Sequence, residues 1–233
     1  MTQRIEVLAD PEALARHVAD WTLQLALSRP GAVAIALSGG STPKRLYHLL
    51  AASPWRERMP WDRVHLFWGD ERFVPADHPD SNQGMARGAL IAHVPIPPAN
   101  LHPVPVDGTP EEAARRYEAE LRRFADTRPG RPLFDLQMLG LGPDGHTASL
   151  FPGTAALEER AAWAIAVIGA KPEPRITLTY PALENSAEVA FLVAGADKRA
   201  MLQRLREGDR GIPAGRLSAS RPVTIFADRA AAP

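Results

Sequence analysis

The sequence predicts a doubly wound α/β fold, in which helices cover both faces of a mainly parallel sheet within one domain, residues 1–233. The continuous apolar run at residues 32–37 indicates a strand covered on both faces, and the mostly apolar run at residues 64–68 indicates a second strand. Segments with helical spacing of apolar residues alternate with such runs, which is typical of a parallel sheet. A chain of 233 residues is long enough for one large domain of this kind.

In the first half of the chain, capping residues mark the helices. Asp10 followed by Pro11 and Glu12 predicts a helix start, because a cap, a proline and an acid all suit the first turn. The stretch beginning at Thr109 repeats this pattern. The predicted helices cover residues 10–29, 43–52, 80–91 and 109–125, the predicted strands 32–37 and 64–68, and the proline-rich stretch 94–110 is expected to be irregular, with a short strand near 101–104.

Apolar runs in the second half predict further strands of the same sheet. They lie at residues 134–141, 163–168, 175–180, 189–194 and 223–226, with a helix at about 197–206 between the last two. Residues 229–233 are expected to be frayed, as chain ends often are. Because no internal repeat or convincing linker interrupts this order, the chain is expected to fold as one domain.

The composition excludes several classes of function. Lys and Arg together number 27, as do Asp and Glu, so a net charge of zero gives no support to wholesale binding of nucleic acid or of an anionic membrane. The absence of cysteine excludes disulfides, thiolate metal sites and cysteine nucleophiles. The chain shows neither an apolar run of membrane-spanning length nor the apolar segment of a signal peptide near its start. A cytoplasmic protein is therefore expected.

A polar loop after the first buried strand is a candidate phosphate site. It consists of Ser38, Gly39, Gly40, Ser41 and Thr42, and a predicted helix follows it. Backbone N–H groups and the helix dipole favour an anion at such a place, and hydroxyl groups add donors. The GxxxxGK[ST] spacing of a nucleotide-binding loop is missing. A purely structural Gly-Gly turn explains the pattern about equally well.

Charged residues follow the next strand. Asp70, Glu71 and Arg72 come directly after it, and Asn82 lies downstream. A surface salt-bridge cluster and the lining of a pocket are equally compatible with this run. Within a pocket, the guanidinium of Arg72 would suit a phosphate or a developing oxyanion.

The most informative segment is residues 134–152, a buried strand followed by a turn that contains Asp144 and His146. A histidine at the end of a strand, two residues after a carboxylate, is a candidate general base. Ligands of open α/β sheets bind at this carboxyl edge. The alternative is a glycine-rich turn whose histidine only caps a helix.

The same segment contains a literal match to the dinucleotide fingerprint, Gly140-x-Gly142-x-x-Gly145. We reject this interpretation because the match lies outside the first strand–helix unit and no second strand ending in an acid follows it. The carboxylate of Asp144 would also repel a pyrophosphate. Two later cations, Arg175 and Lys198, each suit a solvated surface, but together with the 38–42 loop they would form a site for a sugar phosphate.

These motifs resemble the 6-phosphogluconolactonase family. The resemblance rests on LSGGSTP at 37–43, GDERFVP at 69–75, DSN at 80–82, GLGPDGHTASLFP at 140–152 and GADKR at 195–199, in the expected order across most of the chain. It implies a Rossmann-like fold shared with glucosamine-6-phosphate deaminases. It also implies hydrolysis of 6-phospho-D-glucono-1,5-lactone to 6-phosphogluconate in the oxidative pentose phosphate pathway, without a metal or other cofactor.

Carried onto this sequence, the resemblance implies that His146 activates water, that Asp144 orients or polarises this site and that Arg72 holds the substrate or the oxyanion. The phosphate would be held by the 38–42 loop, Arg175 and Lys198, while Asp70 and Asn82 line the substrate pocket. The only partner expected is the small-molecule lactone, with no nucleic acid and no membrane, and the protein is expected to be a monomer.

Three alternatives stay open at this point. In an amino-sugar phosphate deaminase, the position five residues after the histidine carries a glutamate that partners it in ring opening; here that residue is Phe151. A non-catalytic sugar-phosphate sensor would usually carry a DNA-binding segment, for which this chain has no spare basic stretch. A hydrolase centred on Ser38 is weaker, because no G-x-S-x-G nucleophile elbow is present.

Overall fold

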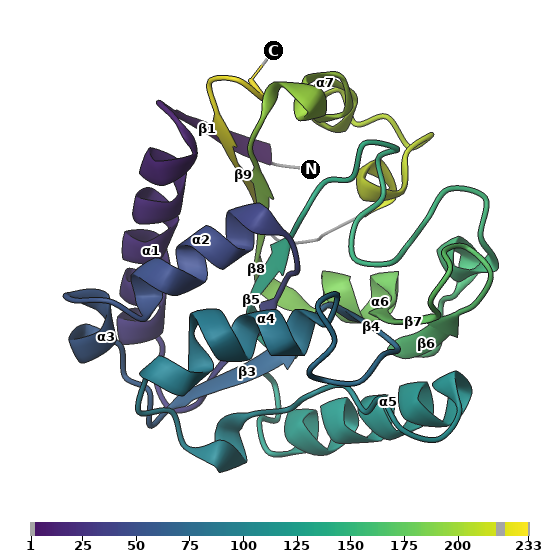
Figure 1. Ribbon diagram of the computed structural model, residues 1–233, viewed down its shortest axis with the longest axis horizontal. Coiled ribbons are helices and arrows are strands. Elements are labelled where there is room, and N and C mark those ends of the chain that lie inside the picture. The colour runs from purple at the N-terminus through teal and green to yellow at the C-terminus, as the bar shows by residue number, and fades with distance from the viewer. Residues whose placement is uncertain (1–2, 218–221, 233) are drawn as a thin grey trace.

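A computed structural model gives the structure of the chain and describes residues 3–217 and 222–232. Within these residues, six parallel strands form a large sheet in the order β1-β9-β8-β5-β2-β3 (Figure 1). The strand order reverses between β2 and β5, which places the expected ligand site at their carboxyl ends. The strands are β1 (Gln3–Leu8), β2 (Val33–Leu37), β3 (Val64–Trp68), β5 (Phe134–Leu139), β8 (Ser186–Val193) and β9 (Val223–Asp228).

Helices flank this sheet on both sides, as the sequence predicts. Figure 1 shows α1 and α2 on one side of the sheet and α6 on the other. The helices are α1 (Pro11–Ser28), α2 (Ser41–Leu50), α3 (Trp55–Arg58), α4 (Asn82–Ala89), α5 (Pro110–Asp126), α6 (Tyr180–Glu184) and α7 (Arg199–Arg206).

The caps predicted at Asp10 and Thr109 are present, and a third lies at the start of the helix predicted over 80–91. The carboxylate of Asp10 accepts the backbone N–H of Ala13 at 2.8 Å and begins α1. Thr109 and Glu112 form a reciprocal capping box at the start of α5. Ser81 caps α4 through its hydroxyl oxygen. Local side-chain chemistry therefore determines these three helix starts.

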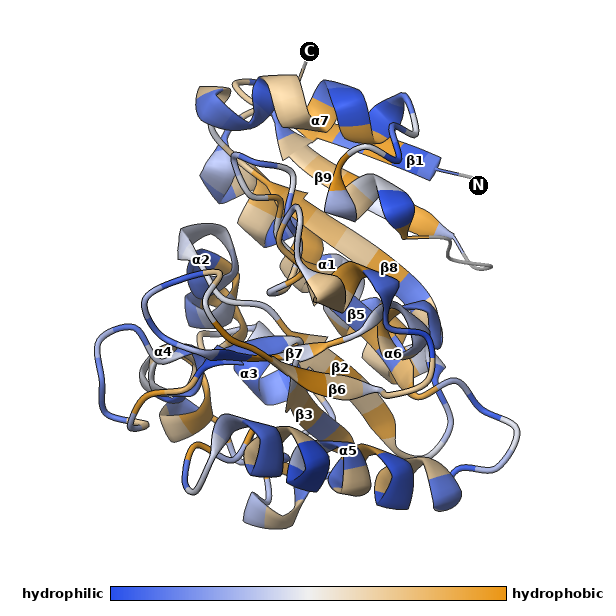
Figure 2. Cartoon of the chain, turned by 90° about the vertical axis from the view of Figure 1, so that its right-hand side faces the viewer, coloured by the Kyte–Doolittle hydropathy of each residue, from blue (hydrophilic) through white to orange (hydrophobic). Residues whose placement is uncertain are grey.

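Apolar side chains on both faces of the central strands form the core. All residues of β2, β5 and β9 are buried, and β8 and β9 are mostly apolar in Figure 2. By contrast, α5 has a buried face and a polar outer face. This is the pattern expected when helices cover a parallel sheet.

The prediction of one sheet was incomplete, because a second sheet lies beside the first. It consists of β4 (Asp70–Arg72), β7 (Arg175–Leu178) and β6 (Ala164–Val167), all antiparallel. The runs at 163–168 and 175–180 were therefore predicted correctly as strands but assigned to the wrong sheet. The connection between them is too short for the crossover that a parallel pair requires.

Four smaller expectations also differ from the structure. Strand β1 was missed, since its charged residues hide the apolar pattern of an edge strand. The strand near 101–104 is a single bridge between Leu101 and Leu66. Helix α2 begins at Ser41 rather than at 43. The tail is packed rather than frayed as far as residue 232: Arg229 N–H bonds Leu8 O, and Ala231 is buried, while Pro233 lies outside the described residues.

Candidate active site

A cavity of about 270 Å³ opens at the carboxyl edge of the large sheet. It lies at the point where the strand order reverses, which is where open α/β sheets bind ligands. Segments that are distant in sequence meet there after β2, β3, β5 and β8. The lining consists of residues 38–43, Asp70, Arg72, Asn82, residues 140–143, residues 146–148, residues 192–194 and Lys198.

The 38–42 loop forms one wall and leads directly into α2. Gly40 has a φ of 104°, in the region that favours glycine. A Cβ on Gly39 would lie 2.1 Å from Oδ1 of Asn82, so only glycine lets the loop pack against this side chain. No side chain caps α2, which leaves its first N–H groups open to a ligand. The wall is therefore suited to an anion.

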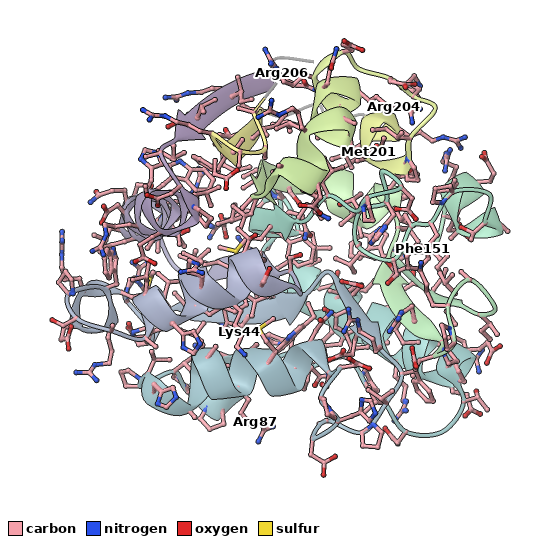
Figure 3. The ribbon with its side chains drawn as sticks, turned by 45° about the horizontal axis from the view of Figure 1, so that its top comes forward. Lys44, Arg87, Phe151, Met201, Arg204 and Arg206 are labelled. Carbon is pink, nitrogen blue, oxygen red and sulfur yellow. The ribbon has the colours of Figure 1, made fainter. Side chains whose placement is uncertain are left out.

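The cations have different positions relative to the cavity. Lys198 lines it and also pairs with Asp197 at 3.2 Å. Arg175 does not line it but is the register partner of Arg72 on the neighbouring strand. Lys44 is exposed and does not line it; Figure 3 shows this residue on α2, away from Phe151.

Arg175 has an unusual environment for an arginine. Its side chain is 11% exposed, and its Nη1 has no hydrogen-bond partner among the described residues. Burial lowers the pKa of its guanidinium, and the positive charge of Arg72 lowers it further. A second cation and an unpaired donor together favour an anion near this pair.

Because side chains alternate along a strand, the three consecutive charged residues of β4 point in two opposite directions. Asp70 and Arg72 line the cavity, whereas Glu71 between them is fully buried on the other side. The Glu71 carboxylate accepts the backbone N–H groups of Arg72, Asn82 and Gln83 at 2.7, 2.8 and 2.7 Å. Burial raises its pKa, although these three hydrogen bonds act in the opposite direction. Glu71 therefore holds the start of α4 against β4.

Asp70 is held from two sides. Ser149 Oγ, which is buried, donates to Asp70 Oδ2 at 2.6 Å. Asn82 Nδ2 donates to the backbone O of Asp70 at 2.9 Å. Since Ser149 belongs to the loop after β5, this hydrogen bond joins the Asp70 segment to the segment that carries His146. The sequence pattern assigns no role to Ser149, because nothing local in the sequence marks its contact with Asp70.

His146 lines the cavity and pairs with Asp144. Its Nδ1 lies 2.5 Å from Asp144 Oδ1, and its backbone N–H donates to the same oxygen at 3.1 Å. Burial alone would raise the pKa of Asp144, but the hydrogen bonds from His146 outweigh it, and the pKa lies below its usual value. With Nδ1 occupied by an ionised carboxylate, Nε2 is the nitrogen left for a proton transfer.

The backbone around His146 is specialised. A Cβ on Gly142 would lie 2.0 Å from Nδ1 of His146, so the imidazole packs directly against the glycine backbone. Ala148 has a φ of 48°, which is uncommon for a residue other than glycine. The residues after Gly145 form turns rather than a helix, and the dinucleotide fingerprint requires a helix there. This backbone therefore agrees with the rejection of a dinucleotide-binding site.

Phe151 completes the surroundings of the imidazole. Its ring centroid lies 4.8 Å from that of His146, and the Lys171 ammonium lies 4.9 Å from the Phe151 centroid on another loop. The His146 ring therefore contacts an apolar ring at the position where a deaminase is expected to carry a carboxylate.

The described residues offer neither a metal site nor a membrane-spanning helix. In residues 3–217 and 222–232, no three His, Asp or Glu side chains cluster in a way that would hold a metal ion. In the same part of the chain, every helix is too short or too polar to cross a bilayer.

A model of the family described as glucosamine-6-phosphate isomerases/6-phosphogluconolactonase matches residues 9–226. The chain belongs to this family. Within it, the chain is 46% identical over 211 residues to a 6-phosphogluconolactonase of Nostoc sp., covering 88% of this chain and 85% of the relative. It is 45% identical over 207 residues to a 6-phosphogluconolactonase of Synechocystis sp., covering 85% and 83%.

A solved structure of this family has the same fold. The 6-phosphogluconolactonase of Thermotoga maritima superposes with a TM-score of 0.84 at 30% identity, over 98% of this chain and 100% of that chain. The expectation of a Rossmann-like, mainly parallel fold with one domain is thereby confirmed.

Proposed function

We propose that this chain is a 6-phosphogluconolactonase, which hydrolyses 6-phospho-D-glucono-1,5-lactone to 6-phosphogluconate in the oxidative pentose phosphate pathway. Relatives with this name at 46% and 45% identity support the reaction. The structural observation that supports it best is that His146 and the 38–42 loop line one cavity, so that a base and an anion site face one small molecule.

The phosphate of the substrate binds at the 38–42 loop, where the first N–H groups of α2 and the hydroxyls of Ser41 and Thr42 are available. Lys198 adds a positive charge from the segment after β8. Arg175, which does not line the cavity, adds positive charge from beside Arg72 and does not contact the phosphate directly. Binding of this remote group holds the lactone carbonyl near the base.

His146 Nε2 then accepts a proton from a water molecule, whose oxygen attacks the carbonyl carbon. Asp144 stabilises the imidazolium through the 2.5 Å contact to Nδ1. The tetrahedral oxyanion forms beside the guanidinium of Arg72. When it collapses, the bond between the carbonyl carbon and the ring oxygen breaks. The imidazolium returns its proton to that oxygen, which gives the open-chain acid.

Asp70 and Asn82 line the same cavity as the base. Asp70 already accepts from Ser149, and its carboxylate has capacity for further donors. We assign it to the hydroxyl groups of the sugar.

A second candidate is an amino-sugar phosphate deaminase, because the family description includes glucosamine-6-phosphate isomerases. Phe151 argues against it, since an apolar ring 4.8 Å from the imidazole cannot polarise it. Release of ammonia from glucosamine 6-phosphate would favour this candidate over the lactonase. Retained binding with no hydrolysis above the spontaneous rate would favour a sensor.

The test is lactone hydrolysis at neutral pH, measured above the spontaneous rate. His146→Ala is expected to lower kcat by about 100-fold or more, because a general base supplies a factor of this size. Arg72→Ala is expected to lower kcat/KM. The matched control is His48→Ala, an exposed histidine of α2 outside the cavity lining, which should retain wild-type turnover. Full turnover of His146→Ala would show that the base is assigned wrongly.

The expectation of a monomer is kept as part of this proposal, because one chain supplies every wall of the cavity. Light scattering coupled to size exclusion tests it. The expected cytoplasmic location is likewise a proposal, which cell fractionation would test; a plant relative that is 37% identical is named as chloroplastic.

A further inference from the structure

Two buried tyrosines bond the backbone at the carboxyl ends of neighbouring strands in the same way. The N–H of Ser38 donates to Tyr47 Oη at 3.0 Å, and the Tyr47 hydroxyl donates to the Ser38 carbonyl at 2.8 Å. The N–H of Trp68 donates to Tyr117 Oη at 2.9 Å, and the Tyr117 hydroxyl donates to the Trp68 carbonyl at 2.8 Å. Each phenol oxygen thus satisfies both backbone groups of one residue.

Each tyrosine hydroxyl supplies the backbone hydrogen bonds that a neighbouring strand would otherwise make at that point. The ladder between β2 and β5 ends at Ala36 and Gln137, so Ser38 lies beyond it. Trp68 is the last residue of β3, which is an edge strand of the large sheet. An extended residue directs its N–H and C=O to the same side, where a neighbouring strand would normally pair with them. Here one hydroxyl group pairs with both.

The two bonds hold different walls of the cavity. Ser38 begins the 38–42 loop, and Tyr47 lies on the helix that this loop enters. The hydrogen bonds of Tyr47 therefore tie the start of the 38–42 loop to the helix that follows the loop. Trp68 comes directly before the segment that carries Asp70 and Arg72, so Tyr117, from α5, holds the wall beside the reacting carbonyl.

Burial keeps both phenols neutral. Tyr47 is fully buried, and Tyr117 is 1% exposed. Burial raises the pKa of both hydroxyls well above the ordinary value, although the bonds to Ser38 and Trp68 act in the opposite direction. Each hydroxyl therefore keeps the proton that it donates throughout the working pH range.

We propose that Tyr47 and Tyr117 are positioning residues with separate tasks: Tyr47 sets the geometry that binds the phosphate, and Tyr117 sets the geometry that acts on the lactone carbonyl. This inference rests on the proposed function, which assigns the 38–42 loop to the phosphate. Neither side chain lines the cavity, so each acts through the backbone residue that it holds.

The test removes one hydroxyl at a time with Tyr47→Phe and Tyr117→Phe. Inorganic phosphate is used as a competitive inhibitor of lactone hydrolysis, and its Ki is measured together with kcat. Tyr47→Phe is expected to raise the Ki about tenfold and to leave kcat within about twofold. Tyr117→Phe is expected to lower kcat about tenfold and to leave the Ki within about twofold.

The matched control is Ser186→Ala. Ser186 is buried at the amino end of β8, and its hydroxyl donates to the Leu183 carbonyl at 2.8 Å. Its loss removes a buried hydroxyl bonded to backbone at the opposite edge of the sheet, so both constants should stay near the wild-type values. A purely structural role of the tyrosines would lower the melting temperature without separating Ki from kcat.

The inference would be overturned if Ki and kcat changed in proportion in both tyrosine variants. It would also be overturned if neither Ki nor kcat changed. Lys198→Ala separates this failure from failure of the site assignment. If Lys198→Ala raises the Ki and Tyr47→Phe does not, the phosphate site stands and the inference is wrong. If neither variant raises it, the site assignment is wrong as well.

A measurement on the unmutated chain tests the inference even if the tyrosine variants do not fold. The chain has three tyrosines, so labelling with 3-fluorotyrosine gives three fluorine resonances. Addition of inorganic phosphate is expected to shift one resonance, that of Tyr47, much more than the other two. No shift, or equal shifts of all three, would contradict the inference.

Discussion

At the scale of single residues, the orientation of His146 depends on three close neighbours. Asp144 occupies its Nδ1 at 2.5 Å, Phe151 contacts its ring, and Gly142 lies directly against it. The first two are side chains whose chemistry is visible in the sequence. The contribution of Gly142 is the absence of a side chain, because any Cβ at this position would overlap the imidazole.

Gly142→Ala is therefore expected to displace the imidazole and to lower kcat about 100-fold, the cost of a misplacement of roughly 1 Å. The measurement is steady-state lactone hydrolysis, with the melting temperature recorded alongside. Gly88→Ala is the matched control, since a Cβ on Gly88 in α4 would meet no atom within 4 Å. Equal activity of the two variants would show that the imidazole does not need this close contact.

At the scale of elements, the three-residue strand β4 connects both sheets to the site. It pairs with β7, and Glu71 ties it to the start of α4 through three backbone N–H groups. Asp70 and Arg72 face the cavity only because Glu71 faces the other way. The direction of the two functional side chains thus depends on a buried carboxylate that lies outside the cavity.

Glu71→Gln is expected to destabilise the protein by about 3 kcal/mol and to lower activity, because an amide cannot accept three N–H donors as a carboxylate does. Thermal unfolding and kcat/KM would be measured together. Glu111→Gln, at an exposed position in the first turn of α5, is the control for loss of a glutamate charge. Wild-type stability of Glu71→Gln would mean that α4 is held by other contacts.

At the scale of the whole molecule, a histidine pair joins the edge strand β3 to α5. His65 Nδ1 lies 3.0 Å from His102 Nε2, and His102 Nδ1 lies 2.6 Å from Glu120 Oε1. Burial, together with the nearby charges of His102 and Arg128, lowers the pKa of His65 to about 4. Burial also lowers the pKa of His102, although Glu120 opposes this.

This cluster predicts a loss of stability in mild acid. The unfolded chain protonates His65 near pH 6.5, whereas the folded protein does so only near pH 4. The stability contributed by the neutral ring is thus complete above pH 6.5 and falls as the pH drops toward 4. Because His65 is only partly buried, solvent screening limits the loss to about 2 kcal/mol.

The measurement is the free energy of unfolding by denaturant between pH 7 and pH 4. His65→Gln is expected to flatten the pH dependence, because the variant has no proton to bind at this position. His48→Gln, an exposed histidine on α2, should keep the wild-type slope. The same slope in wild type and His65→Gln would assign the acid sensitivity to other groups.

Much of the fold could be predicted because local patterns determine it. The starts of α1, α4 and α5 follow from the caps Asp10, Ser81 and Thr109, and β2 and β3 follow from apolar runs. Strand β1 and the second sheet could not be predicted in the same way. An edge strand shows little apolar alternation, and the sheet to which a strand belongs depends on pairing with distant residues.

The candidate site divides in the same way. The sequence by itself determined the types of group, namely the 38–42 loop, the Asp70–Arg72 run and the Asp144–His146 turn, because each is a short motif with a local chemical meaning. Only the tertiary structure decided that residues from all three motifs line one cavity and that Arg175 pairs with Arg72 on the neighbouring strand. The tasks of Glu71, Ser149, Tyr47 and Tyr117 also emerged only there. Each of these side chains acts on backbone or carboxylate groups that folding brings within hydrogen-bond distance, and no local spacing records that contact.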